Sequence, residues 1–115
     1  MMIIEQMDIA VPHTEMKRIA GALEYLTDPT RLLIGCLSCR LFLGLPEEDM
    51  LRVEAHWASM DDLMRYLQSD TYKKFLLLME LGATAPVLKF FTVLEIQGFD
   101  LVREARNPSD QLKCL

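Results

Sequence analysis

One stretch decides how this chain folds: 57-WASMDDLMRYLQSDTYKKF-75. Before it, apolar and polar residues alternate over residues 51–57, which is the period of a half-buried strand. After Trp57 the apolar spacing becomes that of a helix. Ser59 is expected to be the N-cap of this helix, with Asp62 three residues later as its capping-box partner. The stretch therefore predicts a strand that ends at Trp57 and a helix that begins directly after it.

The same stretch contains a second helix start. Ser69-Asp70 offers another N-cap, and Tyr72 and Phe75 continue the apolar stripe beyond it. We expect the helical segment to end near Leu81-Gly82, with the glycine as a C-cap. The sequence thus predicts two helical pieces in succession, separated by a break at Ser69.

This layout resembles the antibiotic biosynthesis monooxygenase family of small dimeric α+β barrels. The resemblance rests on a strand that ends in Trp57, a helix that opens with Leu63, and a Ser69-x-x-Tyr72 break followed by Phe75. It implies a ferredoxin-like fold and a cofactor-independent monooxygenase that acts on an electron-rich aromatic molecule, such as a quinol or a polyketide-like compound. It also implies that Trp57 borders the substrate cavity.

The remaining segments are assigned from periodicity and turn residues. We expect strands at 2–11, 31–44, 50–57 and 86–97, a first helix at 14–26, and a turn at 45–49. Thr14 is a candidate N-cap for the first helix. Asp28-Pro29 should end that helix, because the residue before a proline avoids the helical region. The order βαββαβ predicts an α+β, ferredoxin-like domain with an antiparallel sheet over residues 1–106, followed by a loose tail at 107–115.

The last predicted strand is apolar on both faces. One face carries Val87, Phe91 and Val93, and the other carries Leu88, Phe90, Leu94 and Ile96. The predicted helices can cover only one face of a four-stranded sheet, so a second subunit should cover the other. We therefore expect a homodimer through the sheet face, with residues 99–104 as an extended arm that reaches across to the partner.

Composition excludes several classes of partner. The formal net charge is -5 and there is no basic block, so phosphate neutralisation cannot drive binding to nucleic acid. The longest uninterrupted apolar run, residues 75–79, is too short to span a membrane. The amino terminus lacks the basic region of a secretory signal. We therefore expect a cytoplasmic protein that binds neither nucleic acid nor membrane.

The three cysteines do not predict a metal site. Cys36 and Cys39 have the spacing of half a zinc site, but no second Cys/His pair completes four ligands. Residues three apart in a regular strand also point to opposite faces, so these thiols should not converge. Haem-degrading proteins of the same superfamily hold iron through a His at the position that aligns with Leu76. We therefore expect no metal and no cofactor.

Candidate site residues form two sets. Trp57 and Tyr72 are predicted walls of an aromatic-substrate pocket, and Tyr66 stands where many relatives carry His. A phenol there could orient or deprotonate a quinol. The alternative for Trp57 and Tyr66 is packing in the core. The second set is polar and shares a sheet face by parity: Gln6, Asp8, Ser38, Arg40, Arg52, Glu54 and His56.

Within the polar set, His56 is a candidate catalytic residue, and Gln6 and Arg40 are candidates for substrate binding. The alternative is a solvated or subunit-interface face held by salt bridges. Relatives often carry an acid two residues before the Trp, where this chain has Ala55. The missing His and the missing acid leave a second function open: a non-catalytic dimeric small-molecule-binding or accessory protein on the same fold.

Overall fold

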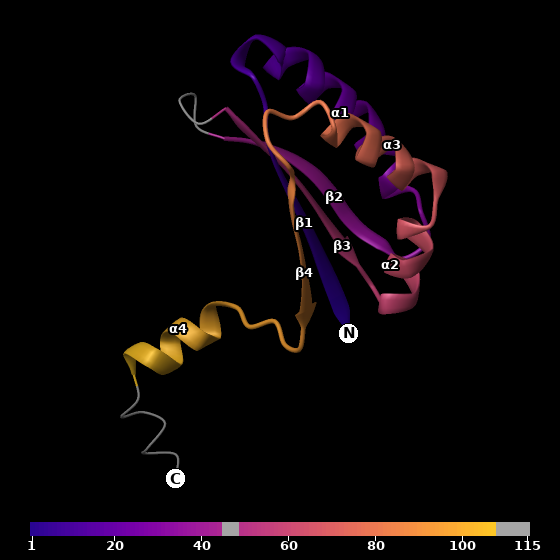
Figure 1. Cartoon of the computed structure of the whole chain (residues 1–115). Coiled ribbons are helices and arrows are strands. Elements are labelled where there is room, and N and C mark those ends of the chain that lie inside the picture. The colour runs from indigo at the N-terminus through magenta and orange to yellow at the C-terminus, as the bar shows by residue number, and fades with distance from the viewer. Residues whose placement is uncertain (45–48, 108–115) are drawn as a thin grey trace.

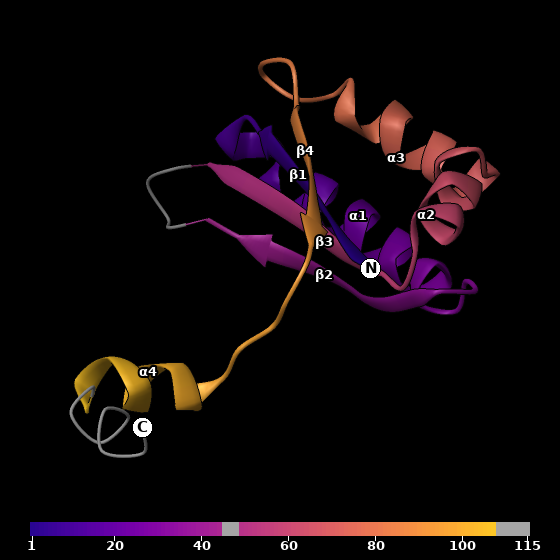
Figure 2. The same ribbon diagram turned by 90° about the horizontal axis from the view of Figure 1, so that it is seen from below.

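Four antiparallel strands form one sheet, and helices α1, α2 and α3 pack on one of its faces (Figures 1 and 2). The computed structural model describes residues 1–44 and 49–107 of the chain. The elements in chain order are β1 (Met2–Ala10), a 3-10 turn η1 (His13–Glu15), α1 (Met16–Arg31), β2 (Cys36–Leu43), β3 (Met50–Trp57), α2 (Met60–Leu67), α3 (Asp70–Met79), β4 (Val87–Val93) and α4 (Phe99–Arg106). The strand order β2-β3-β1-β4 is the ferredoxin-like arrangement, which confirms the predicted fold class.

Alternation on the two central strands decides which face of the sheet the helices cover. The buried residues of these strands are Ile3, Glu5, Met7 and Ile9 on β1, and Leu51, Val53, Ala55 and Trp57 on β3. Ile19 and Leu23 of α1 and Phe75 of α3 complete the core against them. The other side of the sheet is called the open face here, and its residues on β1, β3 and β4 include Ile4, Gln6, Asp8, Arg52, Glu54, His56 and Phe91.

Two serine caps define the break between α2 and α3, as the sequence predicts. The Ser59 hydroxyl accepts a hydrogen bond from the Asp62 backbone N–H at 3.2 Å and donates one to the Asp62 carboxylate at 2.8 Å. The Ser69 hydroxyl accepts from the Tyr72 N–H at 3.2 Å and donates to the Tyr66 carbonyl at 2.6 Å. Each cap satisfies a backbone donor that a helix start would otherwise leave free.

Ser59→Ala should lower the free energy of unfolding by about 1 kcal/mol, because it removes the only side-chain acceptor described at the start of α2. Ser59→Asn is the matched control, since its side-chain oxygen can still accept from the Asp62 N–H. Urea denaturation followed by circular dichroism measures the free energy of unfolding of both variants. An equal loss in the two variants would show that the cap hydrogen bond contributes nothing.

The first helix differs from the prediction at both ends. It begins at Met16 after the 3-10 turn, so Thr14 is not its N-cap, and it continues through Pro29 to Arg31. A proline in the last turn removes only one helical hydrogen bond. The Thr30 hydroxyl donates to the Leu26 carbonyl at 2.8 Å, and buried Thr30 fixes this turn in the core. These contacts hold the last turn in place despite the proline.

Gly82 differs from the expectation, and a second glycine, Gly35, marks a later start of β2 than predicted. Helix α3 ends at Met79, and Gly82 is not a left-handed C-cap. Its role is close approach, because a Cβ at Gly82 would lie 2.8 Å from Ile9 Cγ1. Gly35, with φ +83, ends the loop before β2, which begins at Cys36 rather than at residue 31. Of the predicted turn at 45–49, residues 45–48 lie outside the described ranges.

A β-bulge corrects the prediction for the two cysteines. Cys36 pairs with Trp57 and Ser38 pairs with His56, so Leu37 is an extra residue in β2. The bulge places Cys36 and Cys39 on the same, helix-covered face. Both thiols are free. In residues 1–44 and 49–107 no three His, Cys, Asp or Glu side chains form a group that could hold a metal ion.

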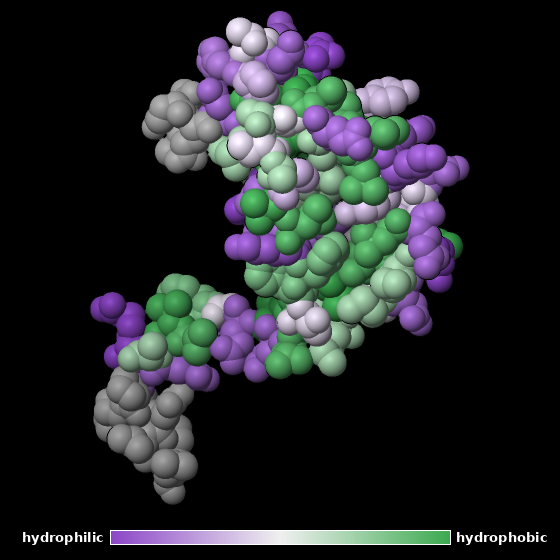
Figure 3. Space-filling view, viewed as in Figure 1, coloured by the Kyte–Doolittle hydropathy of each residue, from purple (hydrophilic) through white to green (hydrophobic). Residues whose placement is uncertain are grey.

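The C-terminal segment is a helix rather than an extended arm. Strand β4 ends at Val93, short of the predicted residue 97, and α4 projects away from the body of the molecule (Figures 1 and 2). Its approach segment exposes 83% of Leu94 and 75% of Ile96. Figure 3 shows apolar surface on this projection. None of the helices in the described part of the chain is long and apolar enough to cross a membrane.

Candidate functional site

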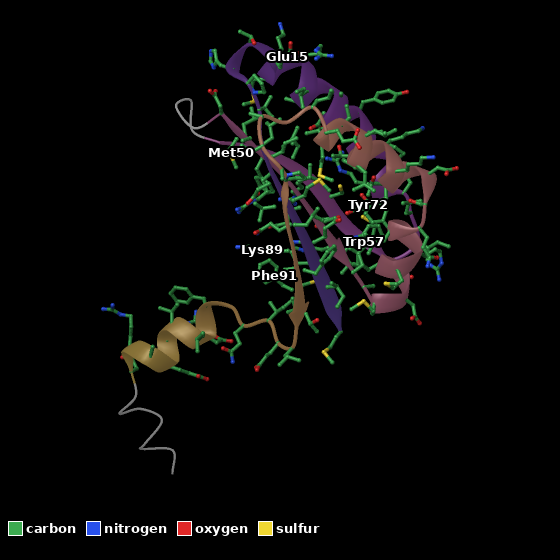
Figure 4. The ribbon with its side chains drawn as sticks, viewed as in Figure 1. Glu15, Met50, Trp57, Tyr72, Lys89 and Phe91 are labelled. Carbon is green, nitrogen blue, oxygen red and sulfur yellow. The ribbon has the colours of Figure 1, made fainter. Side chains whose placement is uncertain are left out.

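Three aromatic side chains meet where β3 ends and the α2–α3 break begins. Trp57, the last residue of β3, stacks on Tyr66 of α2 with ring centroids 4.5 Å apart. Tyr72, in the first turn of α3, meets Tyr66 edge-on at 5.0 Å. All three are buried, and Figure 4 shows Trp57 and Tyr72 between the sheet and the helices. The structure therefore brings these three predicted site residues together.

A pocket of about 130 Å³ opens beside this aromatic cluster. Its lining residues are Leu33, Ile34, Trp57, Asp62, Arg65, Tyr66 and Ser69. Arg65 and Asp62 form an ion pair at 3.1 Å in this wall. The loop before β2 forms another wall, and Gly35 allows it to approach α2, because any Cβ there would collide with the Asp62 side chain. The pocket is therefore mainly apolar and aromatic, with one charged pair.

Glu5 is a buried carboxylate beside the aromatic cluster that sequence reasoning did not select. It is 1% exposed, and neither carboxylate oxygen has a hydrogen-bond partner. Burial raises the pKa of Glu5 to about 7, and the nearby Tyr72 hydroxyl opposes part of this shift without reaching hydrogen-bonding geometry. Glu5 pairs with Ala55 across β1 and β3, so the chain carries an acid one strand away from the position at which the family resemblance implies one. The sequence did contain a signal for this: in the strand alternation, Glu5 falls between Ile3 and Met7 and therefore on the buried face of β1.

The other groups around Glu5 stay protonated near neutral pH. Burial raises the pKa of Tyr66 above its usual range, and the Glu5 carboxylate adds to this shift. Burial likewise raises the pKa of Tyr72 to about 12 and that of Cys39 to about 12. Tyr66 can therefore donate a hydrogen bond to a substrate, but it cannot take its proton.

The polar candidates lie on the open face, across the sheet from the aromatic cluster. Gln6 donates to Glu54 at 3.1 Å, and His56 Nε2 lies 3.1 Å from the other Glu54 carboxylate oxygen. Arg40 pairs with Glu54 across β2 and β3 and is exposed. Although burial alone would raise the pKa of Glu54, the hydrogen bonds from Gln6 and His56 hold it below its usual value. Because the sheet separates His56 from Tyr66, one protomer cannot apply both to the same small substrate.

A comparison with known families decides what this arrangement belongs to. The sequence model described as antibiotic biosynthesis monooxygenase matches residues 2–76. The chain belongs to the antibiotic biosynthesis monooxygenase family. The matched span contains Glu5, Trp57, Tyr66 and Tyr72, whereas β4 and α4 lie outside it. No curated protein matches the chain.

Solved structures agree with this assignment at the level of the fold. A candidate antibiotic biosynthesis monooxygenase from Caulobacter crescentus is 25% identical, with a TM-score of 0.72 over 82% of this chain and 91% of that one. One from Deinococcus radiodurans is 15% identical, with a TM-score of 0.74 over 84% and 96%. The protein Rv0793 from Mycobacterium tuberculosis is 16% identical, with a TM-score of 0.75 over 85% and 100%.

Proposed function

We propose that this member of the antibiotic biosynthesis monooxygenase family is a cofactor-independent monooxygenase of electron-rich aromatic molecules. The observation that carries the proposal is the pocket walled by the stacked Trp57 and Tyr66 rings. Flat apolar walls favour an aromatic ring, and exclusion of water protects a reactive anion. The pocket volume of about 130 Å³ is close to that of an engineered cavity of about 150 Å³ that holds benzene. Its size favours a single-ring quinol or phenol over a polyketide-like compound.

The chemistry requires the substrate to lose a proton before it meets oxygen. Deprotonation of the hydroxyl raises the electron density of the ring, which can then reduce O₂. A new carbon–oxygen bond forms at a ring C–H carbon, and the second oxygen atom leaves as water. In balance, a phenol and O₂ give a quinone and water, and the ring supplies all the electrons. The chain would contribute binding, orientation and a proton acceptor, and no cofactor.

The test is oxygen uptake with a panel of single-ring hydroquinones and substituted phenols, with quinone absorbance as a second readout. We expect at least one compound to be oxidised, and Tyr66→Phe should lower kcat about tenfold or more because a donor to the anion is lost. Tyr25→Phe is the matched control, since Tyr25 is 79% exposed on α1. Absence of turnover across the panel, together with absence of a ligand-induced thermal shift, would contradict the proposal.

A second function is favoured by one observation: burial raises the pKa of the Tyr66 phenol, which stays protonated and cannot act as a base. The protein would then be a dimeric small-molecule-binding or accessory protein on the same fold. A ligand that shifts the melting temperature without being oxidised would support it. Unchanged turnover in Tyr66→Phe would instead make Tyr66 a packing residue.

We also propose a homodimer through the open face. The apolar open-face residues of β4, Val87, Phe91 and Val93, have no covering helix in the described part of the chain. The polar residues of this face are largely paired within the protomer: Arg52 holds Asp8 through two hydrogen bonds of 2.6 and 2.9 Å, and Glu54 holds Gln6 and His56. A face whose charges are already paired can be buried at lower cost.

A further inference from the structure

We propose that Glu5 and Trp57 form a two-point site for the oxygen of a neutral phenol. Glu5 takes the hydroxyl proton, and the Trp57 indole N–H donates a hydrogen bond to the oxyanion that results. This inference rests on the proposed function and names the catalytic base and the substrate class of the same site.

The two groups share an unusual condition. In residues 1–44 and 49–107, the buried side-chain nitrogen and oxygen atoms without a hydrogen-bond partner are Glu5 Oε1, Glu5 Oε2 and Trp57 Nε1. Leaving a buried polar group unpaired destabilises the folded state, and such groups are rare in native proteins. Their coincidence on one face indicates a ligand or substrate group that pairs with them.

The sheet register holds the two groups close together. Glu5 pairs with Ala55 and Ile3 pairs with Trp57, so Glu5 and Trp57 are diagonal neighbours on adjacent strands. Diagonal side chains on one face can contact a common partner. Ala55 fills little of the space beside Glu5. The register therefore places an acceptor and a donor at neighbouring positions of the helix-covered face.

A phenol hydroxyl matches this pair of groups. It can donate its proton to the carboxylate and accept from the indole N–H, which is a donor only. Among the neighbouring groups, the Tyr66 and Tyr72 phenols and the Cys39 thiol stay protonated near neutrality, whereas Glu5 titrates there. General-base catalysis is most effective when the pKa of the base lies near the working pH.

The site also predicts which ligands are rejected. The buried polar or charged residues of the described chain are Glu5, Thr27 and Thr30, none of them a cation. The cation in the pocket wall, Arg65, is already paired with Asp62. An aryl carboxylate would place a second negative charge beside Glu5. The site therefore suits a neutral phenol and discriminates against a benzoate.

The proton inventory closes within one turnover. Glu5 receives the hydroxyl proton as the phenolate forms and returns it to the oxygen atom that leaves as water. The second proton of this water comes from the ring C–H carbon at which the new carbon–oxygen bond forms. Tyr66 lines the open pocket, but Glu5 does not. Tyr72 lies next to Tyr66 and also next to the Glu5 carboxylate. Substrate entry therefore displaces the Tyr72 ring, which lies beside the Glu5 carboxylate, while Trp57 and Tyr66 remain the walls of the pocket.

The first experiment measures kcat/KM against pH with a substrate from the oxygen-uptake panel. The kcat/KM of the wild type should rise with pH to a plateau, with an apparent pKa of about 7, as the carboxyl of Glu5 ionises in the free enzyme. Glu5→Gln should remove this inflection and lower kcat about 100-fold or more, while Glu24→Gln on the exposed surface of α1 leaves the profile unchanged. A Glu5→Gln enzyme that keeps its rate and its inflection overturns the inference, and the proposed function survives.

The second experiment needs no turnover. Under nitrogen, the wild type at pH 8 should bind phenol and reject benzoate, as measured by calorimetry. Trp57→Phe keeps an aromatic ring but loses the N–H, and it should bind phenol about tenfold more weakly. Equal phenol affinity in Trp57→Phe, or benzoate bound as well as phenol, overturns the inference. If these binding results hold and no compound is oxidised, the two-point site stands and the proposed oxidation fails.

Discussion

Glu5→Gln should remove about 3 kcal/mol of pH dependence from the free energy of unfolding, because burial raises the pKa of Glu5 from 4.5 to about 7. Between these two values the folded state binds more protons than the unfolded state, so the free energy of unfolding falls as the pH rises. The contribution of Glu5 is therefore fully present below a pH of about 4.5, and it is lost as the pH rises through about 7.

Urea denaturation at a fixed protein concentration, repeated at several pH values from about 4 to about 8, measures this slope. The difference between the wild type and Glu5→Gln isolates the carboxyl from all other titrating groups. Glu54→Gln is a control of opposite sign. The pKa of Glu54 is lowered in the folded state, so its contribution is present at neutral pH and is lost as the pH falls through the folded pKa. Parallel curves for the wild type and Glu5→Gln would show that Glu5 is solvated or paired in solution.

Local hydrogen-bonding chemistry was readable from the sequence. Ser59 and Ser69 predicted both helix starts, and alternation placed Trp57 at the end of β3, because caps and periodicity depend on residues close in the chain. Pro29 misled the reading because the last turn of a helix can lose one hydrogen bond when Thr30 and Arg31 supply others. The bulge at Leu37 made the prediction for Cys36 and Cys39 wrong. One extra residue in a strand moves the residues that precede it to the opposite face of the sheet.

The candidate site could be predicted only in part, because strand alternation shows which face a residue is on but not which groups it contacts. Parity alone put Gln6 and His56 on one face and Trp57 on the other, so the separation of the two candidate sets was already present in the sequence. Parity also put Glu5 in the core, but a single carboxylate carries no signal until its partners are known. The absence of a hydrogen-bond partner is a property of the packed structure, and it is what distinguishes Glu5 from the other carboxylates.

Phe91→Asp should weaken dimer formation about 1000-fold or more, since a buried aromatic anchor contributes about 2 kcal/mol and a two-fold interface contains it twice. Phe91 is 43% exposed on the open face, and Figure 4 shows it on the opposite side of the sheet from Trp57. Light scattering at micromolar concentration should give the wild type a mass near twice the 13.2 kDa chain and Phe91→Asp a mass near that of one chain. Tyr25→Asp on the outer side of α1 is the matched control and should stay dimeric. A monomeric wild type, or a dimeric Phe91→Asp, would show that the open face is not the interface.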